Sequence, residues 1–141
     1  MSPLDQESIQ FKVNRIRKNL GELEKMGKLS YHAYIREEHN KYVAERLLQV
    51  SIEAVLDIGS HIIAEEGLGE PLEYRDVFKI LCQAKILPKA KLENFQNMVG
   101  LRNRIVHLYE TIDHRLIHRF LRKDLDDFEA YLRMAVRYLK K

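Results

Sequence analysis

The chain has 141 residues, of which 45% are apolar and 32% charged, a size and balance typical of one domain with a single core over residues 1–141. Its formal net charge of +3 is too small to indicate nucleic-acid binding by itself. No apolar run approaches the length of a membrane-spanning helix and the N-terminus lacks an apolar signal segment, so we expect a cytoplasmic protein without membrane contact. Cys82 is the only cysteine, which excludes an intramolecular disulfide and a thiolate metal cluster.

Apolar residues recur at helical spacing along the whole chain. Gly27 ends the first predicted helix, Ser30 can cap the second, and Pro88 suits a first helical turn. The predicted helices span residues 5–26, 30–66 (with a possible break near 39–40), 74–84 and 88–109, followed by two that start at Asp113 and Asp124. Since no segment alternates like a strand, we predict an all-α fold, an antiparallel bundle of five to six helices.

The predicted helix over residues 42–63 is apolar nearly all round, which is typical of a helix buried by several neighbours. Its polar residues share one narrow stripe: Arg46, Gln49, Glu53, Asp57 and Ser60. This stripe faces solvent, a cleft or a subunit interface. A solvated stripe with an internal Arg46–Glu53 ion pair is an equally good interpretation.

Residues 92–109 contain a charged residue within the apolar face of the predicted helix, a breach of the amphipathic pattern. Arg102 falls inside the broad apolar arc of this segment, and Tyr109, seven residues later, shares its direction. His107 and Asn103 lie together at the edge of the arc. A buried guanidinium is costly unless it is paired or open to a cleft, so the breach marks a candidate functional site.

An arginine and a histidine can together cleave RNA without a metal ion. Arginine binds a phosphate through two donors, and histidine exchanges a proton near neutral pH. The ribose 2′-OH then attacks its own phosphodiester, with the histidine moving protons and the arginine stabilising the charged transition state. The R-x4-H pattern alone is weak, however. On spacing alone, a structural Arg102 and a core-edge His107 are the favoured interpretation.

Other chemistry has less support in the sequence. It contains no P-loop, no GxSxG, no HExxH and no dinucleotide fingerprint. The pairs His32 with His39 and His114 with His118 lack carboxylate or cysteine partners in register, so we interpret them as surface histidines and expect no metal and no cofactor. The basic segment HRLIHRFLRK, residues 114–123, can attract phosphate, although a plain solvated face explains it equally well.

The segment RNRIVHLY, residues 102–109, resembles the R-x4-H-x-Y signature of HEPN-domain toxins of the HepT type. The similarity extends to YVAERLLQVSIEAVLDIGSHIIAEEG at 42–67, which looks like the second long helix of that family. EPLEYRDVFKIL at 70–81 and FQNMVGLRNRIVH at 95–107 follow in the typical order. The resemblance covers about residues 35–125.

This resemblance implies an α-helical HEPN bundle, usually a homodimer, with metal-independent endoribonuclease activity. It implies the toxin of a type VII toxin–antitoxin system, whose partner is a minimal nucleotidyltransferase (MNT) antitoxin. Arg102 and His107 match the pair assigned to RNA cleavage, and Asn103 matches the polar residue that follows the arginine. Tyr109 matches the tyrosine to which the antitoxin transfers AMP.

On one ideal helix the directions of Arg102 and His107 are about 140° apart, so the two side chains of one chain do not meet at one point. Two copies around a two-fold axis can build one shared cleft, and we therefore expect the site at a dimer interface. Glu53 and Asp57 can orient Arg102 or His107 there, although plain surface explains them equally well. The alternatives are a non-catalytic module that binds a nucleotide or a nucleotidyltransferase, and a purely structural bundle. RNA is the expected substrate; DNA is not expected.

Overall fold

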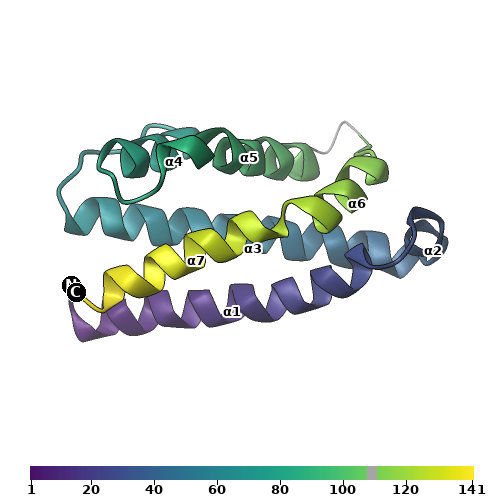
Figure 1. Ribbon diagram of the computed structural model, residues 1–141, viewed down its shortest axis with the longest axis horizontal. Coiled ribbons are helices and arrows are strands. Elements are labelled where there is room, and N and C mark those ends of the chain that lie inside the picture. The colour runs from purple at the N-terminus through teal and green to yellow at the C-terminus, as the bar shows by residue number, and fades with distance from the viewer. Residues whose placement is uncertain (108–110) are drawn as a thin grey trace.

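The computed structural model describes residues 1–107 and 111–141. This part of the chain forms an all-α bundle without strands (Figure 1), which confirms the predicted fold class. It contains seven α-helices and one 3-10 turn: α1 (Pro3–Gly27), α2 (Tyr31–Arg36), α3 (Glu38–Glu65), α4 (Tyr74–Gln83), η1 (Lys89–Lys91), α5 (Leu92–Val106), α6 (His114–Lys123) and α7 (Leu125–Leu139).

The helix count exceeds the predicted five to six because the chain breaks at Glu37. This residue has extended backbone angles (φ −95°, ψ 107°), so α2 and α3 are separate helices. Ser30 caps α2 as expected, since its hydroxyl accepts a 3.1 Å hydrogen bond from the amide of Ala33. The Asn40 side-chain amide donates to the carbonyl of Tyr34 at 3.1 Å, which satisfies an acceptor that the break removes from the helical ladder.

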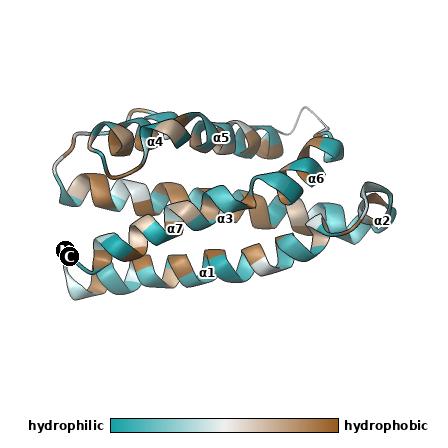
Figure 2. Cartoon of the chain, in the orientation of Figure 1, coloured by the Kyte–Doolittle hydropathy of each residue, from teal (hydrophilic) through white to brown (hydrophobic). Residues whose placement is uncertain are grey.

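Helix α3 is the centre of the bundle. It packs against α1, α2, α4, α5, α6 and α7, and apolar residues (brown) recur along its ribbon in Figure 2. By length and composition alone α3 is long and apolar enough to cross a membrane, which the sequence analysis did not anticipate. Half of its most apolar window is buried inside the bundle, as expected for a core helix.

Gly59 lets two helices approach α3 closely. A Cβ at this position would lie 2.5 Å from Val77 Cγ1 of α4 and 2.7 Å from the Tyr131 hydroxyl of α7. That hydroxyl donates a 2.8 Å hydrogen bond to the carbonyl of Val55, one turn earlier on α3. The absence of a side chain at Gly59 therefore permits both the packing of α4 and the hydrogen bond of the buried Tyr131.

Gly59→Ala is expected to lower the free energy of unfolding by about 1–3 kcal/mol, because the added methyl overpacks the core. The matched control is Gly21→Ala in α1, where a Cβ would meet nothing within 4 Å. The control should gain about 0.5–1 kcal/mol from helix propensity. Urea denaturation of both variants measures the difference, and equal stability of the two would contradict this account of the packing.

Helix α5 ends before the predicted residue 109. Its last helical residue is Val106, and His107 is the C-cap with extended backbone angles (φ −72°, ψ 115°). The His107 amide still donates to the carbonyl of Asn103 at 3.2 Å, so His107 closes the last turn while the chain leaves the helix axis. The expectation of one continuous helix through Tyr109 is therefore wrong, and Tyr109 itself lies outside the described residues.

Candidate active site

Arg102 projects from α5 toward α3 and pairs with Glu53. Its Nε and Nη2 atoms both donate to Glu53 Oε2, at 2.9 and 2.8 Å. The arginine side chain is 19% exposed and the glutamate 33%, so the pair lies at the edge of the core. Glu53 of the polar stripe thus contacts Arg102 within one chain, whereas the orienting role expected for Glu53 and Asp57 at a dimer interface stays a prediction. The alternative Arg46–Glu53 pair is not among the ion pairs of the described chain.

Two further side chains contact the Arg102 guanidinium, and a third orients its carboxylate partner. Tyr74, the first residue of α4, places its ring 4.9 Å from the guanidinium carbon, a cation–π contact. Asn103 accepts a 3.3 Å hydrogen bond from Arg102 Nη1. Gln49 donates to Glu53 Oε2 at 3.4 Å and so helps to orient the carboxylate. The guanidinium is thus held from α3, α4 and α5 at once.

The held guanidinium still has donors to offer. A guanidinium carries five N–H groups. Within the described chain Nε uses its one on Glu53, Nη2 uses one on the same oxygen, and Nη1 uses one on Asn103. One N–H on each terminal nitrogen is left for a ligand. These two nitrogens form the fork with which arginine recognises phosphate.

His107 and Asp57 are placed differently from Arg102. His107 is exposed at the C-terminal end of α5 and its side chain makes no hydrogen bond within the described residues. Asp57 is exposed one turn after Glu53 on α3, and it contacts neither Arg102 nor His107 through any hydrogen bond or ion pair of the described chain. Within the described residues the arginine is therefore held by several side chains, whereas the histidine side chain has no hydrogen-bond partner.

The interpretation of His114 and His118 as surface histidines is wrong. The His114 Nδ1 atom shares a 2.8 Å hydrogen bond with the Tyr34 hydroxyl, and its Nε2 lies 3.3 Å from Glu45 Oε2. His118 is 5% exposed and its Nε2 lies 2.8 Å from the carbonyl of Leu29. Burial, with the charge of Glu45 second, raises the pKa of Tyr34, so its phenol stays neutral.

These histidines connect α6 to α2 and to the turn that precedes α2. The His118 ring stacks on Tyr34 with 5.2 Å between centroids. The spacing of His114, Ile117, His118 and Leu121 along one face of α6 could have indicated this burial. The described residues contain no group of three or more histidine, cysteine or acidic side chains placed to hold a metal ion.

Comparison with known proteins agrees with this architecture. Residues 16–135 match the model of the family described as "Ribonuclease HepT-like". The mRNA nuclease HepT of Shewanella oneidensis is 35% identical over 85 residues, which are 60% of this chain and 64% of that relative, so the match spans less than two thirds of its length. The tRNA nuclease HepT of Aphanizomenon flos-aquae is 27% identical over 139 residues, 99% of this chain and 95% of that protein.

A solved structure shows the same fold over nearly the whole chain. The tri-AMPylated HEPN toxin of Shewanella oneidensis, determined in complex with an MNT antitoxin, superposes with a TM-score of 0.85 at 26% identity. The superposition covers 97% of this chain and 99% of that one. The resemblance inferred from the residues around Arg102 is therefore confirmed, and the chain belongs to the HepT-like ribonuclease family.

Proposed function

We propose that this chain is a toxin that cleaves RNA without a metal ion, with Arg102 binding the scissile phosphate and His107 transferring the proton. The observation that supports the proposal most strongly is how the Arg102 guanidinium is held. Glu53 and Tyr74 hold its guanidinium in place, while one N–H on each terminal nitrogen is left over. In a member of the HepT-like ribonuclease family, such a group is a prepared phosphate-binding site.

The proposed reaction is an internal transesterification. The ribose 2′-oxygen attacks the adjacent phosphorus, its proton passes to a base, and the bond from phosphorus to the 5′-oxygen breaks. The leaving 5′-oxygen takes a proton, so the products are a 2′,3′-cyclic phosphate and a 5′-hydroxyl. His107 is exposed, and an imidazole can both accept and donate a proton, which suits it to one of these transfers. Arg102 stabilises the charge that develops on the phosphate.

Glu53 and Asn103 act as positioning residues in this proposal. Glu53 takes two donors of Arg102 on a single oxygen, which fixes the plane of the guanidinium. Asn103 restrains Nη1. Asp57 makes no hydrogen bond or ion pair with Arg102 or His107 within the described residues, so we propose that it acts on a group that a second copy or the RNA brings.

Cleavage of RNA by the purified protein in the presence of a chelator tests the proposal. We expect products with cyclic phosphate and 5′-hydroxyl ends, formed at the same rate with and without EDTA. A requirement for added Mg²⁺ would exclude the mechanism. Products with 5′-phosphate ends would exclude it as well, because attack by the 2′-oxygen cannot produce them.

The alternative, a non-catalytic module, is favoured by one observation. Glu53 already provides Arg102 with a counter-charge, so the charge of the arginine is balanced without any ligand. Such a module would bind a nucleotide or a nucleotidyltransferase and leave RNA intact. The cleavage assay separates the two functions, since only the ribonuclease degrades RNA.

We further propose that the active form is a homodimer. Arg102 points toward α3 and α4, whereas His107 lies exposed at the end of α5, so a second copy is needed to supply a histidine facing each arginine. Apolar side chains are exposed at Tyr74 (45% exposed), whose ring contacts Arg102, and at Leu72 (90% exposed), two residues before Tyr74 in the sequence. An exposed apolar patch of this kind is typical of an interaction surface.

Sedimentation at micromolar concentration is expected to show a dimer. Leu72→Glu should shift the protein toward the monomer, because a charge in the contact opposes burial of the interface. The control Leu4→Glu places the same charge on Leu4 of α1, which is also largely exposed (77%), and should leave the dimer intact. A monomeric wild type contradicts the proposed arrangement.

The proposed partner is an MNT-type nucleotidyltransferase, since the superposed HEPN toxin was determined in complex with an MNT antitoxin. Because the proposed RNA substrate and the ATP that such an enzyme consumes are cytoplasmic, this proposal includes a cytoplasmic location. Tyr109, two residues after His107, is the proposed site of AMP transfer.

A further inference from the structure

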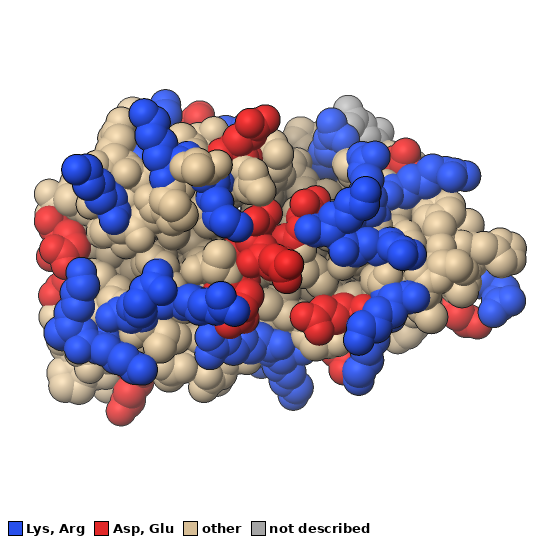
Figure 3. Space-filling model, in the orientation of Figure 1, with Lys and Arg blue, Asp and Glu red and all other residues tan. Residues whose placement is uncertain are grey.

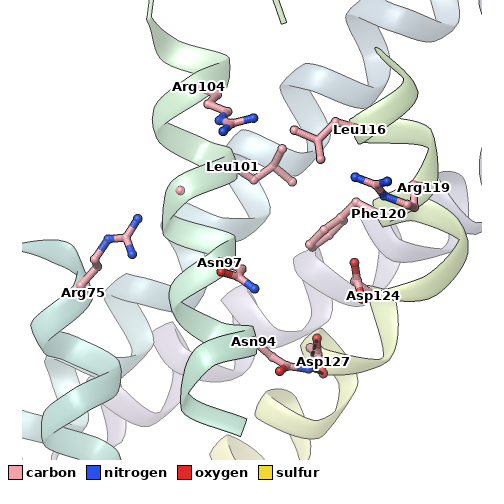
Figure 4. A pocket seen from close by; sticks show the side chains of 11 residues that line it. Arg75, Asn94, Asn97, Leu101, Arg104, Leu116, Arg119, Phe120, Asp124 and Asp127 are labelled. Carbon is pink, nitrogen blue, oxygen red and sulfur yellow. Dashed lines mark hydrogen bonds between the residues drawn. The ribbon is translucent and has the colours of Figure 1, made fainter. Parts of the chain in front are cut away.

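A cavity of about 500 Å³ lies between α5 on one side and α6 and the start of α7 on the other (Figure 4). Three arginines from three helices line it: Arg75 of α4, Arg104 of α5 and Arg119 of α6. Figure 4 shows Arg104 and Arg119 entering from opposite walls, with Leu101 and Leu116 between them. This cavity is separate from the Glu53 side of α5, because Arg102 and Arg104 point about 160° apart around the helix.

The three guanidinium groups are not neutralised within the described chain. The arginines that lie within 4.0 Å of a carboxylate oxygen there are Arg17, Arg102 and Arg133, and none of these lines the cavity. Three arginines share this concave surface with two acidic side chains, Asp124 and Asp127, and Asp127 is also ion-paired with Lys91, so a net positive charge is left that an anion can offset.

Gly100 leaves room for the Arg75 side chain at this cavity. A Cβ at Gly100 would lie 3.2 Å from Arg75 Nη2, tighter than ordinary van der Waals contact. The missing side chain lets the Arg75 guanidinium lie against the surface of α5 and reach the cavity from α4. A larger residue at this position would push the guanidinium away from the other two arginines.

Two acidic side chains, Asp124 and Asp127, also line the cavity. Asp127 Oδ1 lies 3.2 Å from Lys91 Nζ, and the Asn94 amide donates to both Asp127 oxygens. Burial, followed by the charge of Asp127, raises the pKa of Asp124, while Arg119 and Lys123 oppose the rise. The cavity therefore has an acidic end, where Asp127 is ion-paired with Lys91 and Asp124 interacts with the charge of Arg119, and a cationic end at Arg104 and Arg119.

The cationic end continues onto the basic segment 114–123. Arg115, Arg119, Arg122 and Lys123 are all exposed on α6. Figure 3 shows Lys and Arg gathered on this face of the molecule around the position of α6. Arg104 also lines a second cavity, together with Ile105 and Thr111, beside the end of α5 where His107 lies. A strand of linked phosphates could thus run from α6 past Arg104 to His107.

We propose that Arg75, Arg104 and Arg119 form a phosphate-binding subsite that holds the RNA strand beside the scissile bond. The inference rests on the proposed ribonuclease function, and it assigns these arginines to binding of the strand and not to the reaction. Asn97, which lines the same cavity, offers an amide to a ribose or base of the bound nucleotide. A series of linked phosphates fits several cationic groups in a row better than a free nucleotide does.

The test is RNA binding as a function of salt, measured by fluorescence anisotropy with a labelled single-stranded oligoribonucleotide. Full-length protein with His107→Ala prevents cleavage during the measurement. Arg119→Gln in this background should weaken binding roughly threefold to tenfold. It should reduce the slope of log Kd against log salt concentration by about 0.7, the value for one lost contact to a single strand. Arg104→Gln together with Arg119→Gln should reduce it by about twice that amount.

Two control variants separate the subsite from general charge. Arg15→Gln removes the same charge from an exposed position on α1 and should leave the slope unchanged. Arg119→Lys keeps the charge and should keep the slope. In the wild-type His107 background, Arg119→Gln should raise KM for the oligonucleotide and leave kcat near its original value. Equal slopes for Arg119→Gln and Arg15→Gln overturn the proposal.

ATP as a competitor distinguishes the source of the phosphate. If the subsite serves the RNA strand, ATP displaces the oligonucleotide only weakly, and Arg119→Gln changes RNA binding. If Arg119→Gln abolishes ATP binding and leaves RNA binding unchanged, the cavity is a nucleotide site and the proposal is wrong. If the wild type cleaves RNA but the arginine variants behave like Arg15→Gln, only this inference fails; if the wild type neither binds nor cleaves RNA, the ribonuclease function fails with it.

Discussion

His107→Ala is expected to reduce the rate of RNA cleavage by about 10²-fold to 10⁴-fold, the usual contribution of a group that transfers a proton in the transition state. The variant should fold normally, because His107 is exposed at the end of α5 and makes no side-chain hydrogen bond in the described chain. The control is His32→Ala, which removes an equally exposed histidine from α2. Cleavage at the full rate by the His107 variant would remove this residue from the mechanism.

Arg102→Ala should cause a comparable loss of about 10²-fold to 10³-fold, since it removes a fixed donor to the transition state. Arg102→Lys should recover only a small part of the rate, because an ammonium group lacks the planar fork that spans two phosphate oxygens. Arg133→Ala, on an exposed position of α7, is the matched control and should leave the rate unchanged. Circular dichroism of each variant confirms that lost activity does not reflect unfolding.

Glu53→Gln tests how the arginine is positioned. The amide keeps one oxygen as an acceptor for Arg102 but removes the charge that attracts the guanidinium. A positioning role requires a lower kcat with a smaller change in KM, whereas a purely structural role would change stability alone. The comparison therefore separates orientation of Arg102 from support of the fold.

AMP attached to Tyr109 is expected to abolish RNA cleavage. Tyr109 follows His107 by two residues, so its Cα lies within about 7 Å of the His107 Cα in any conformation. In the transfer, the phenol oxygen attacks the α-phosphate of ATP and pyrophosphate leaves. The attached nucleotide brings a phosphate and an adenosine to the place where RNA must bind, and it can pair with Arg102.

Incubation with the cognate nucleotidyltransferase and ATP, followed by mass spectrometry, tests this modification. We expect adenylyl mass on Tyr109 together with loss of cleavage, and no recovery after the nucleotidyltransferase is removed. Tyr109→Phe should still cleave RNA and should resist inactivation. If the Phe variant is neutralised as completely as the wild type, the partner blocks the site by binding alone.

The sequence predicted the helices well because their boundaries depend on local chemistry. Ser30 and Asp113 act as caps as expected, and the apolar periphery of residues 42–63 identified the central helix. The breach at Arg102 correctly marked an unusual position, since a charged group within an apolar arc needs a partner. Glu53 was a candidate partner because it belongs to the polar stripe of the same buried helix.

Features that depend on long-range placement were missed. Nothing near Tyr74 in the sequence indicates that its ring will lie under Arg102, because α4 and α5 meet only in the folded bundle. His114 and His118 were misplaced because histidine is as often exposed as buried, and their partners Tyr34 and Glu45 are distant in sequence. The end of α5 at Val106 was missed because apolar and helix-forming residues continue beyond it.

The release of His107 from α5 has a consequence for dosage. The His107 side chain makes no hydrogen bond within the described residues, and in the proposed arrangement a second toxin fixes its orientation, so the histidine is catalytically useful only in the dimer. Below the dimer dissociation constant, the concentration of dimer rises with the square of the monomer concentration. Small amounts of toxin that escape its partner would then be harmless, whereas a modest further increase would stop growth abruptly. The position of His107 outside the helix thus gives the toxin a threshold response to its own concentration.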